Sequence, residues 1–143
     1  MRLTAKGEYG MRAVLNLATR ASGEPVSVNR IAQEEGISAE FLEQIFFRLK
    51  KAGLVRSVRG PKGGFVLNRD KAEVSLKTVL DALQEPIYPV PCTNHENGGC
   101  ERQEDCTMSP VWHDFYAVMR DHLSGVMLGD VLRRREPASP VAS

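Results

Sequence analysis

The chain has 143 residues, 42% of them hydrophobic and 26% charged, which suits one domain, or one small domain with an extension, and allows a core without disulfide bonds. It contains no stretch approaching the length of a membrane span and no signal-peptide pattern, so we expect a soluble, cytoplasmic protein with no membrane partner. The net charge of +1 is unevenly spread along the chain. Residues 1–70 carry 12 Lys or Arg against 7 Asp or Glu, whereas residues 71–143 carry 7 against 11. The positive charge of the first half suits it to binding a polyanion.

The first helix signal is an amphipathic pattern within residues 3–21. Apolar side chains recur there at the i, i+3, i+4, i+7 spacing, at Met11, Val14, Leu15 and Ala18. Ser27 then suits the N-cap of a short helix over residues 28–35 that ends at Gly36.

A second short helix follows almost at once. Ser38 is its expected N-cap, Glu40 is an acid in its first turn, and Gly53 marks its end. Its inward stripe is Leu42, Ile45, Phe46 and Leu49. Two short helices across a tight turn predict a helix-turn-helix.

Two short strands come next, over residues 54–58 and 64–67. The turn between them, residues 59–63, is basic and contains two glycines. A helix-turn-helix followed by a basic hairpin predicts a winged helix, and we assign residues 1–85 to a DNA-binding domain of this type.

The outer side of the second helix offers side chains for the major groove. Gln44 suits adenine, Glu43 can accept from a cytosine amino group, and Phe41 can meet a thymine methyl. Basic side chains of the helix and the turn suit phosphates and a narrow minor groove. The alternative is an ordinary solvated helix face. The candidate DNA-contacting residues are Arg2, Ser38, Glu40, Phe41, Glu43, Gln44, Arg48, Lys51, Arg59 and Lys62.

All three cysteines of the chain lie in one loop. Ser75 is the expected cap of a helix that buries Leu76, Val79, Leu80 and Leu83 and ends before Pro86. Residues 86–108 then hold Cys92, Cys100 and Cys106. Three thiolates suit a metal or an iron–sulfur centre, whereas an odd number is awkward for a disulfide framework. No Cys-His-acid arrangement is evident, so we do not expect an enzyme.

A long helix is predicted from Ser109, as N-cap, with Pro110 in the first turn, to about Met127. Its apolar stripe, Val111, Phe115, Val118, Met119 and His122, predicts either a dimer seam or packing within the chain. Gly129 is expected to break the pattern before a short segment over residues 130–135. Residues 109–135 thus form a dimerisation helix and a short C-terminal helix, and residues 136–143 a disordered tail.

Four sets of residues together resemble a known family: residues 1–7, residues 41–46, residues 59–65, and the three cysteines with Trp112 six positions on. They are similar to the IscR-like winged-helix iron–sulfur regulators and to their nitric-oxide-sensing NsrR-type relatives. The resemblance implies a mainly α fold with a small β-hairpin wing, a homodimer formed by the long helix, and double-stranded promoter DNA as partner. It also implies that Glu43 and Gln44 are the recognition pair, that Arg59 is the wing arginine, and that the three cysteines are cluster ligands.

The sequence departs from this family in two places. Seven residues separate Cys92 from Cys100, where five are typical, and Ser109 stands where IscR has a histidine ligand. We expect Glu8 as the fourth ligand, by similarity to the acidic residue that nitric-oxide-sensing relatives supply from the partner subunit. His95, His113 and then Ser109 are the alternatives.

These patterns predict a DNA-binding regulator controlled by an iron–sulfur cluster. A [2Fe–2S] cluster is expected and a [4Fe–4S] cluster is the alternative, with cluster-assembly proteins as candidate donors. The signal is cluster supply, iron, redox state or nitric oxide. A zinc-stabilised winged-helix repressor that does not sense redox state is the other interpretation of the same residues.

Overall fold

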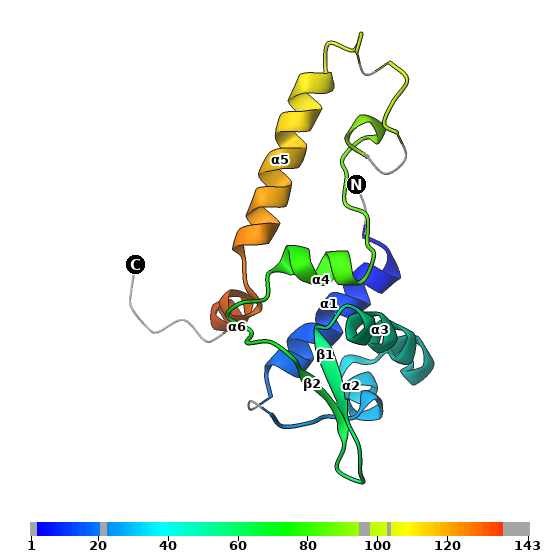
Figure 1. The fold of residues 1–143 in the computed structure, drawn as a ribbon, viewed down its shortest axis with the longest axis vertical. Helices are drawn as coiled ribbons and strands as arrows, with labels where there is room; N and C mark the ends of the chain where they lie inside the picture. Colours follow the sequence, from blue (N-terminus) through cyan, green and yellow to red (C-terminus); the bar gives the residue numbers. More distant parts are fainter. Residues whose placement is uncertain (1–2, 21–22, 95–97, 103, 136–143) are drawn as a thin grey trace.

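One long helix projects from a winged helix in this structure (Figure 1). The computed structural model describes residues 3–20, 23–94, 98–102 and 104–135. The expected contact residue Arg2, the candidate ligand His95 and the expected tail over residues 136–143 lie outside these ranges.

The described chain is mainly α with one two-stranded antiparallel hairpin, as the sequence predicts. Its elements are α1 (Ala5–Ala18), α2 (Val28–Glu35), α3 (Ala39–Lys51), β1 (Val55–Val58), β2 (Gly64–Leu67), α4 (Leu76–Ala82), the 3-10 turn η1 (Pro91–Thr93), α5 (Ser109–Gly125) and α6 (Leu128–Arg135).

Three serines begin helices at the predicted positions. The side chains of Ser27, Ser38 and Ser75 accept hydrogen bonds from backbone N–H groups in the first turns of α2, α3 and α4. Gly36 ends α2 with φ +68°, a left-handed conformation that favours glycine. Local capping chemistry therefore fixes the helix-turn-helix boundaries.

Helix α1 turns a different face inward from the one that its hydrophobic pattern predicts. Val14 and Ala18 are buried, but Met11 and Leu15 are half-buried at its flank, and Ala13 and Leu17 take their places. Close packing against the end of α4 explains this rotation. A Cβ atom on Gly10 would lie 2.5 Å from the Leu83 side chain, so the absence of a side chain at Gly10 lets Leu83 pack closely against α1.

Ion pairs join α1 to α2 at the surface. Arg20 pairs with Glu34, and Arg12 Nε lies 3.4 Å from Glu35 Oε1. The hydrogen bond from Arg20 lowers the pKa of Glu34 below its ordinary value. These exposed pairs orient the two helices but contribute little to stability.

The hairpin is anchored against the rest of the chain at the start of β2, close to its turn. Val26 pairs with Phe65 through an isolated β-bridge, and Phe65 stacks on Phe46 of α3 with ring centroids 4.8 Å apart. Gly64 has φ +154°, and a Cβ there would lie 2.2 Å from the Val26 carbonyl oxygen. This contact sets the direction of the wing relative to α3.

The boundary between α5 and α6 differs from the sequence prediction. Ser109 is the first residue of α5 rather than its N-cap, the preceding Met108 makes no side-chain cap bond, and the helix ends at Gly125. Gly129 lies inside α6, which begins at Leu128. A short ladder causes the break, because Leu76 N–H donates to the Val126 carbonyl at 2.9 Å and the Leu128 N–H donates to Val74 at 2.9 Å.

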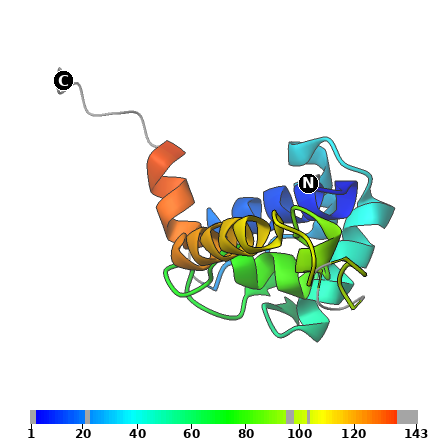
Figure 2. The ribbon, with the colours of Figure 1, turned by 90° about the horizontal axis from the view of Figure 1, so that it is seen from above.

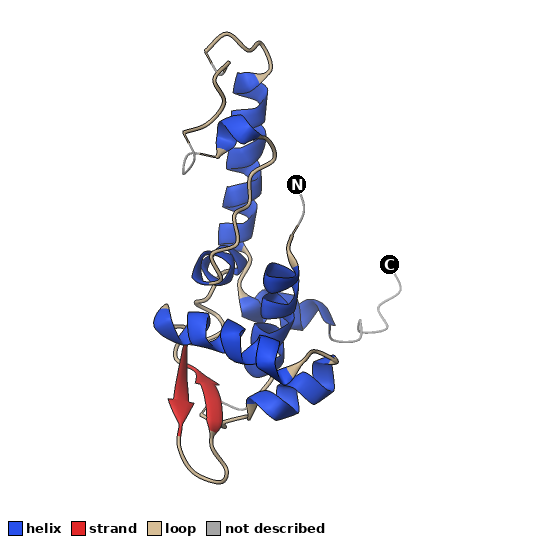
Figure 3. Cartoon of the chain, turned by 90° about the vertical axis from the view of Figure 1, so that its right-hand side faces the viewer, coloured by secondary structure: helices blue, strands red, loops and turns tan. Residues whose placement is uncertain are grey.

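These two hydrogen bonds bring the chain back to the winged helix after α5. Helix α6 therefore packs beside α1, while α5 extends away from the winged helix (Figures 1 and 2). Seen from the side, the segment before α5 runs alongside it (Figure 3). Among the described residues, no helix combines the length and apolar character needed to cross a membrane.

Candidate nucleic-acid interface and cysteine segment

The outward face of α3 is fixed by complete burial of its opposite side. Leu42, Ile45, Phe46 and Leu49 are at most 1% exposed, as predicted from the sequence. The helix cannot rotate without exposing this stripe, so its other side must face solvent. The exposed side chains are Glu40, Glu43, Gln44, Phe47, Lys50 and Lys51.

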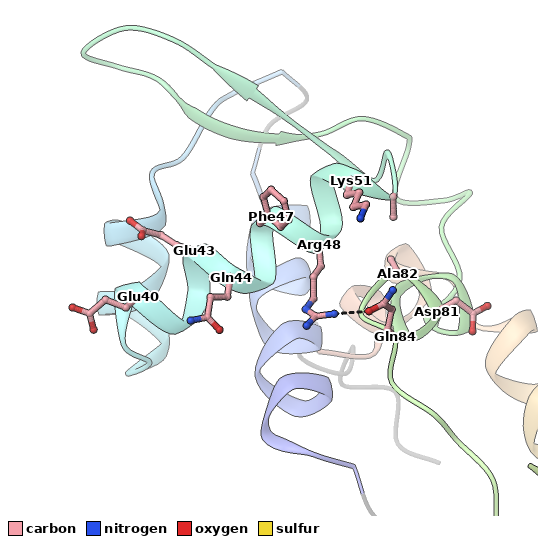
Figure 4. Close-up of a pocket in the computed structure, with 10 residues that line it drawn as sticks. Glu40, Glu43, Gln44, Phe47, Arg48, Lys51, Asp81, Ala82 and Gln84 are labelled. Atoms are coloured by element: carbon pink, nitrogen blue, oxygen red, sulfur yellow. Dashed lines mark hydrogen bonds between the residues drawn. The ribbon is translucent and has the colours of Figure 1, made fainter. Parts of the chain in front are cut away.

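This face borders a groove of about 840 Å³ between α3 and the end of α4 (Figure 4). Side chains of both signs line it: Glu40, Glu43, Gln44, Phe47, Arg48, Lys51, Asp81 and Gln84. Phe47 is 68% exposed, which is unusual for so large an apolar side chain. Phe47 is not among the contact residues that the sequence predicts.

Two predicted contact residues at the start of α3 already have structural roles. The Ser38 hydroxyl accepts from the Phe41 N–H at 3.2 Å, which leaves its own O–H able to donate. The ring of Phe41 is half-buried and packs edge-on against Tyr9, with centroids 5.9 Å apart.

Arg48 has a specific partner inside the chain. Its Nη1 donates to Gln84 Oε1 at 2.5 Å, across the groove from α3 to the residue just beyond α4 (Figure 4). Sequence reasoning missed Gln84, because nothing local distinguishes it and 36 positions separate it from Arg48.

The tip of the wing is basic and exposed. Arg59 and Lys62 are both exposed, on a turn closed by a 2.9 Å hydrogen bond from Gly63 N–H to the Gly60 carbonyl. Gly60 has φ +116°, which favours glycine at this position. The turn therefore presents two cations beyond the end of the hairpin.

The cysteines sit in different environments. Cys92 lies in η1 and is 7% exposed, whereas Cys100 and Cys106 are exposed. Within the described ranges, no three His, Cys, Asp or Glu side chains come together as a metal site. The donor set itself, three reduced thiols, fits iron or an iron–sulfur cluster.

The candidates for a fourth ligand are placed differently. Glu8 is exposed in the first turn of α1. Ser109 is buried, and its hydroxyl and carbonyl oxygens lie 3.3 and 2.8 Å from Nδ1 of His113. The shared hydrogen bonds make Ser109 the least available of these donors.

A buried carboxylate ties the start of the cysteine segment, residues 86–108, to α1. Glu85 is 5% exposed and accepts from the Thr4 N–H at 2.8 Å and the Thr4 hydroxyl at 2.6 Å. A Cβ on Gly7 would lie 2.7 Å from this side chain. The chain thus enters the cysteine segment from a fixed point.

Helix α5 carries an uncovered apolar stripe. Val111, Phe115 and Val118 are 52%, 49% and 68% exposed, and they share one helix face by their spacing. Met119 of the predicted stripe is half-buried and His122 is exposed. Among the described residues, the rest of the chain therefore covers the stripe only in part.

The chain matches known proteins over nearly all of its length. Residues 3–134 match the Rrf2 family, described as iron-dependent transcriptional regulators. The HTH-type transcriptional regulator IscR of Escherichia coli is 36% identical over 136 residues, which cover 95% of this chain and 83% of that protein.

Solved structures are similar as well. An IscR from T. potens superposes with a TM-score of 0.77 at 28% identity, covering 100% of this chain and 94% of the other. CymR, the global cysteine regulator of B. subtilis, superposes with a TM-score of 0.78 at 27% identity, covering 95% and 99%.

Proposed function

Because this chain belongs to the Rrf2 family of iron-dependent transcriptional regulators, we propose that it is a homodimer whose promoter binding is controlled by an iron–sulfur cluster on Cys92, Cys100 and Cys106. The chain is an IscR-like, DNA-binding transcriptional regulator, since its relatives are regulators rather than enzymes. The placement of the cysteine segment carries the finer proposal: it runs from the end of α4, at the groove, to the start of the uncovered helix α5.

DNA binding in this proposal uses α3 and the wing. Glu43 and Gln44 contact base edges in the major groove, where Gln pairs with adenine and Glu accepts from cytosine. Arg48 and Lys51 contact phosphates, which positions the protein without selecting sequence. Arg59 and Lys62 at the wing tip enter or border the minor groove, and Arg2 adds a further cation.

Dimerisation in this proposal uses the α5 stripe of two copies. A helix of 17 residues whose only buried residue is Ser109 gains little from its own chain. Covering Val111, Phe115 and Val118 with the same stripe of a second copy buries three large apolar side chains on each side. A symmetric pair of recognition helices follows, which suits a palindromic operator.

The cluster site in this proposal consists of the three cysteines and Glu8. When bound, an iron–sulfur cluster supplies a centre that responds to redox state, iron supply or nitric oxide. Glu8 is exposed on α1 and can act across the dimer. A carboxylate ligand in place of a fourth thiolate leaves one iron more reactive, which suits a sensor. We favour [2Fe–2S] over [4Fe–4S], with cluster-assembly proteins as donors.

Control of DNA binding in this proposal passes through the two ends of the cysteine segment. Glu85 holds one end against α1, and Ser109 begins the dimer helix at the other. Any change in the order of residues 86–108 therefore acts on the position of α5 relative to the winged helix, and so on the spacing of the two recognition helices.

The visible spectrum of anaerobically purified protein, with iron and sulfide analysis, tests the cofactor. We expect a coloured protein with iron and acid-labile sulfide, and Cys100→Ala should lose the colour while its far-UV circular dichroism and dimer mass are unchanged. A colourless wild-type protein that contains zinc would replace this proposal with the zinc-stabilised repressor.

A further inference from the structure

Gln84 has a backbone conformation that its side chain does not favour. Its φ is +56°, the only positive φ at a non-glycine residue in the part of the chain that the structure describes. Such a conformation is unfavourable for a residue with a side chain and persists where surrounding contacts hold it. Two backbone hydrogen bonds close the end of α4 around it, from Gln84 to Asp81 at 3.0 Å and from Glu85 to Leu80 at 2.9 Å.

Neighbouring helices hold Gln84 from two further sides. Lys6 of α1 donates to its carbonyl oxygen at 3.2 Å, and Arg48 of α3 donates to its side-chain oxygen at 2.5 Å. The next residue, Glu85, is fixed by Thr4. The backbone that carries the acceptor for Arg48 is therefore held by several contacts, and the Gln84 side chain itself is exposed.

We propose that Gln84 is a positioning residue for DNA binding, which holds the Arg48 guanidinium at the rim of the groove for a DNA phosphate. This inference rests on the phosphate contact proposed above for Arg48. A guanidinium has five N–H donors, so the bond from Nη1 to Gln84 leaves others for phosphate oxygens. A long side chain that is already held in place loses less conformational entropy when DNA binds, so the entropic cost of binding is smaller.

The chemistry of the groove favours positioning over sequestration. Gln84 is a neutral acceptor, which holds an arginine less strongly than a carboxylate does and does not cancel its charge. Asp81 lines the same groove, but its ion pair is with Lys77. Arg48 thus keeps its full charge for an anion.

A double-mutant cycle with Arg48→Ala and Gln84→Asn tests this inference on the full-length chain. Asn tolerates a left-handed backbone but is too short to keep the bond to Arg48. Dissociation constants are measured at several salt concentrations for a random duplex and for a selected site. We expect Gln84→Asn to weaken binding to both duplexes by the same factor, about 2- to 10-fold, and to have no further effect in the Arg48→Ala background.

A second variant separates the side chain from the backbone. Gln84→Gly removes the same contact and relieves the positive φ, so it should reproduce the loss seen with Gln84→Asn. Additive effects of the two mutations, or tighter DNA binding by Gln84→Asn, would overturn the inference. The inference would also be overturned if Arg48→Ala weakened DNA binding and Gln84→Asn did not. That outcome would leave the proposed phosphate contact of Arg48 intact. No loss on Arg48→Ala would remove that contact and the inference together.

Discussion

At the scale of single residues, the proposed DNA interface contains side chains that can select sequence and side chains that can only contact phosphates. Gln44 is exposed on α3, on a face whose rotation is fixed by the buried stripe opposite. Lys51 lies two turns further on, near the end of the same helix. An amide can distinguish bases, whereas an ammonium group contacts phosphates of any sequence.

Replacing these two residues should therefore have different consequences. Gln44→Ala should reduce discrimination at one or two base pairs by about 1–3 kcal/mol each. Lys51→Ala should weaken binding to all sequences and reduce the salt slope by about one. Competition binding with systematically varied duplexes measures both effects. If each variant lost the same affinity for the selected site as for random DNA, the assignment of α3 as the recognition helix would be contradicted.

Glu85 is the residue whose loss should most affect the junction between α1, α4 and the cysteine segment. Its buried carboxylate accepts two hydrogen bonds from Thr4, and hydrogen bonds to charged groups contribute about 1.5–3 kcal/mol. Glu85→Ala should lower the free energy of unfolding by about 2 kcal/mol in urea titrations. Exposed Glu73→Ala is the matched control, and a similar small change in both variants would contradict this role.

At the scale of elements, sequence predicted well whatever depends on near neighbours. The caps at Ser27, Ser38 and Ser75 and the buried stripe of α3 are local, and each is confirmed. The rotation of α1 was missed because it depends on contact between Gly10 and Leu83, which are distant in the sequence. The α5–α6 boundary was missed because it depends on the pairing of Val126 with a distant segment. Gln84 was missed at the candidate site for the same reason.

A charge on the apolar stripe of α5 should disrupt the proposed dimer. Val118 is 68% exposed on the uncovered stripe, whereas Ser124 is exposed on nearly the opposite face. Val118→Asp places a charge in the proposed seam and should convert the dimer to a monomer. Ser124→Asp adds the same charge outside it and should remain dimeric. Size-exclusion chromatography with light scattering distinguishes them, and a dimeric Val118→Asp protein would place the interface elsewhere.

At the scale of the whole molecule, three parts with different tasks share one short chain. The winged helix presents α3 and the wing, α5 presents an uncovered apolar stripe, and residues 86–108 connect them (Figure 1). The three thiols are not assembled within the described residues, and in the proposed function their assembly depends on the dimer and the cofactor. The proposed function implies that binding of a cofactor there acts on both ends of residues 86–108 at once.

Control of DNA binding by the cysteine segment is tested by the affinities of cluster-loaded and cluster-free protein for a common set of genomic DNA sites, at one fixed salt concentration. We expect at least one promoter site to distinguish the two forms, and Cys100→Ala to bind that site as the cluster-free protein does. Equal affinities of both forms at every selected site would contradict control of DNA binding by the cysteine segment.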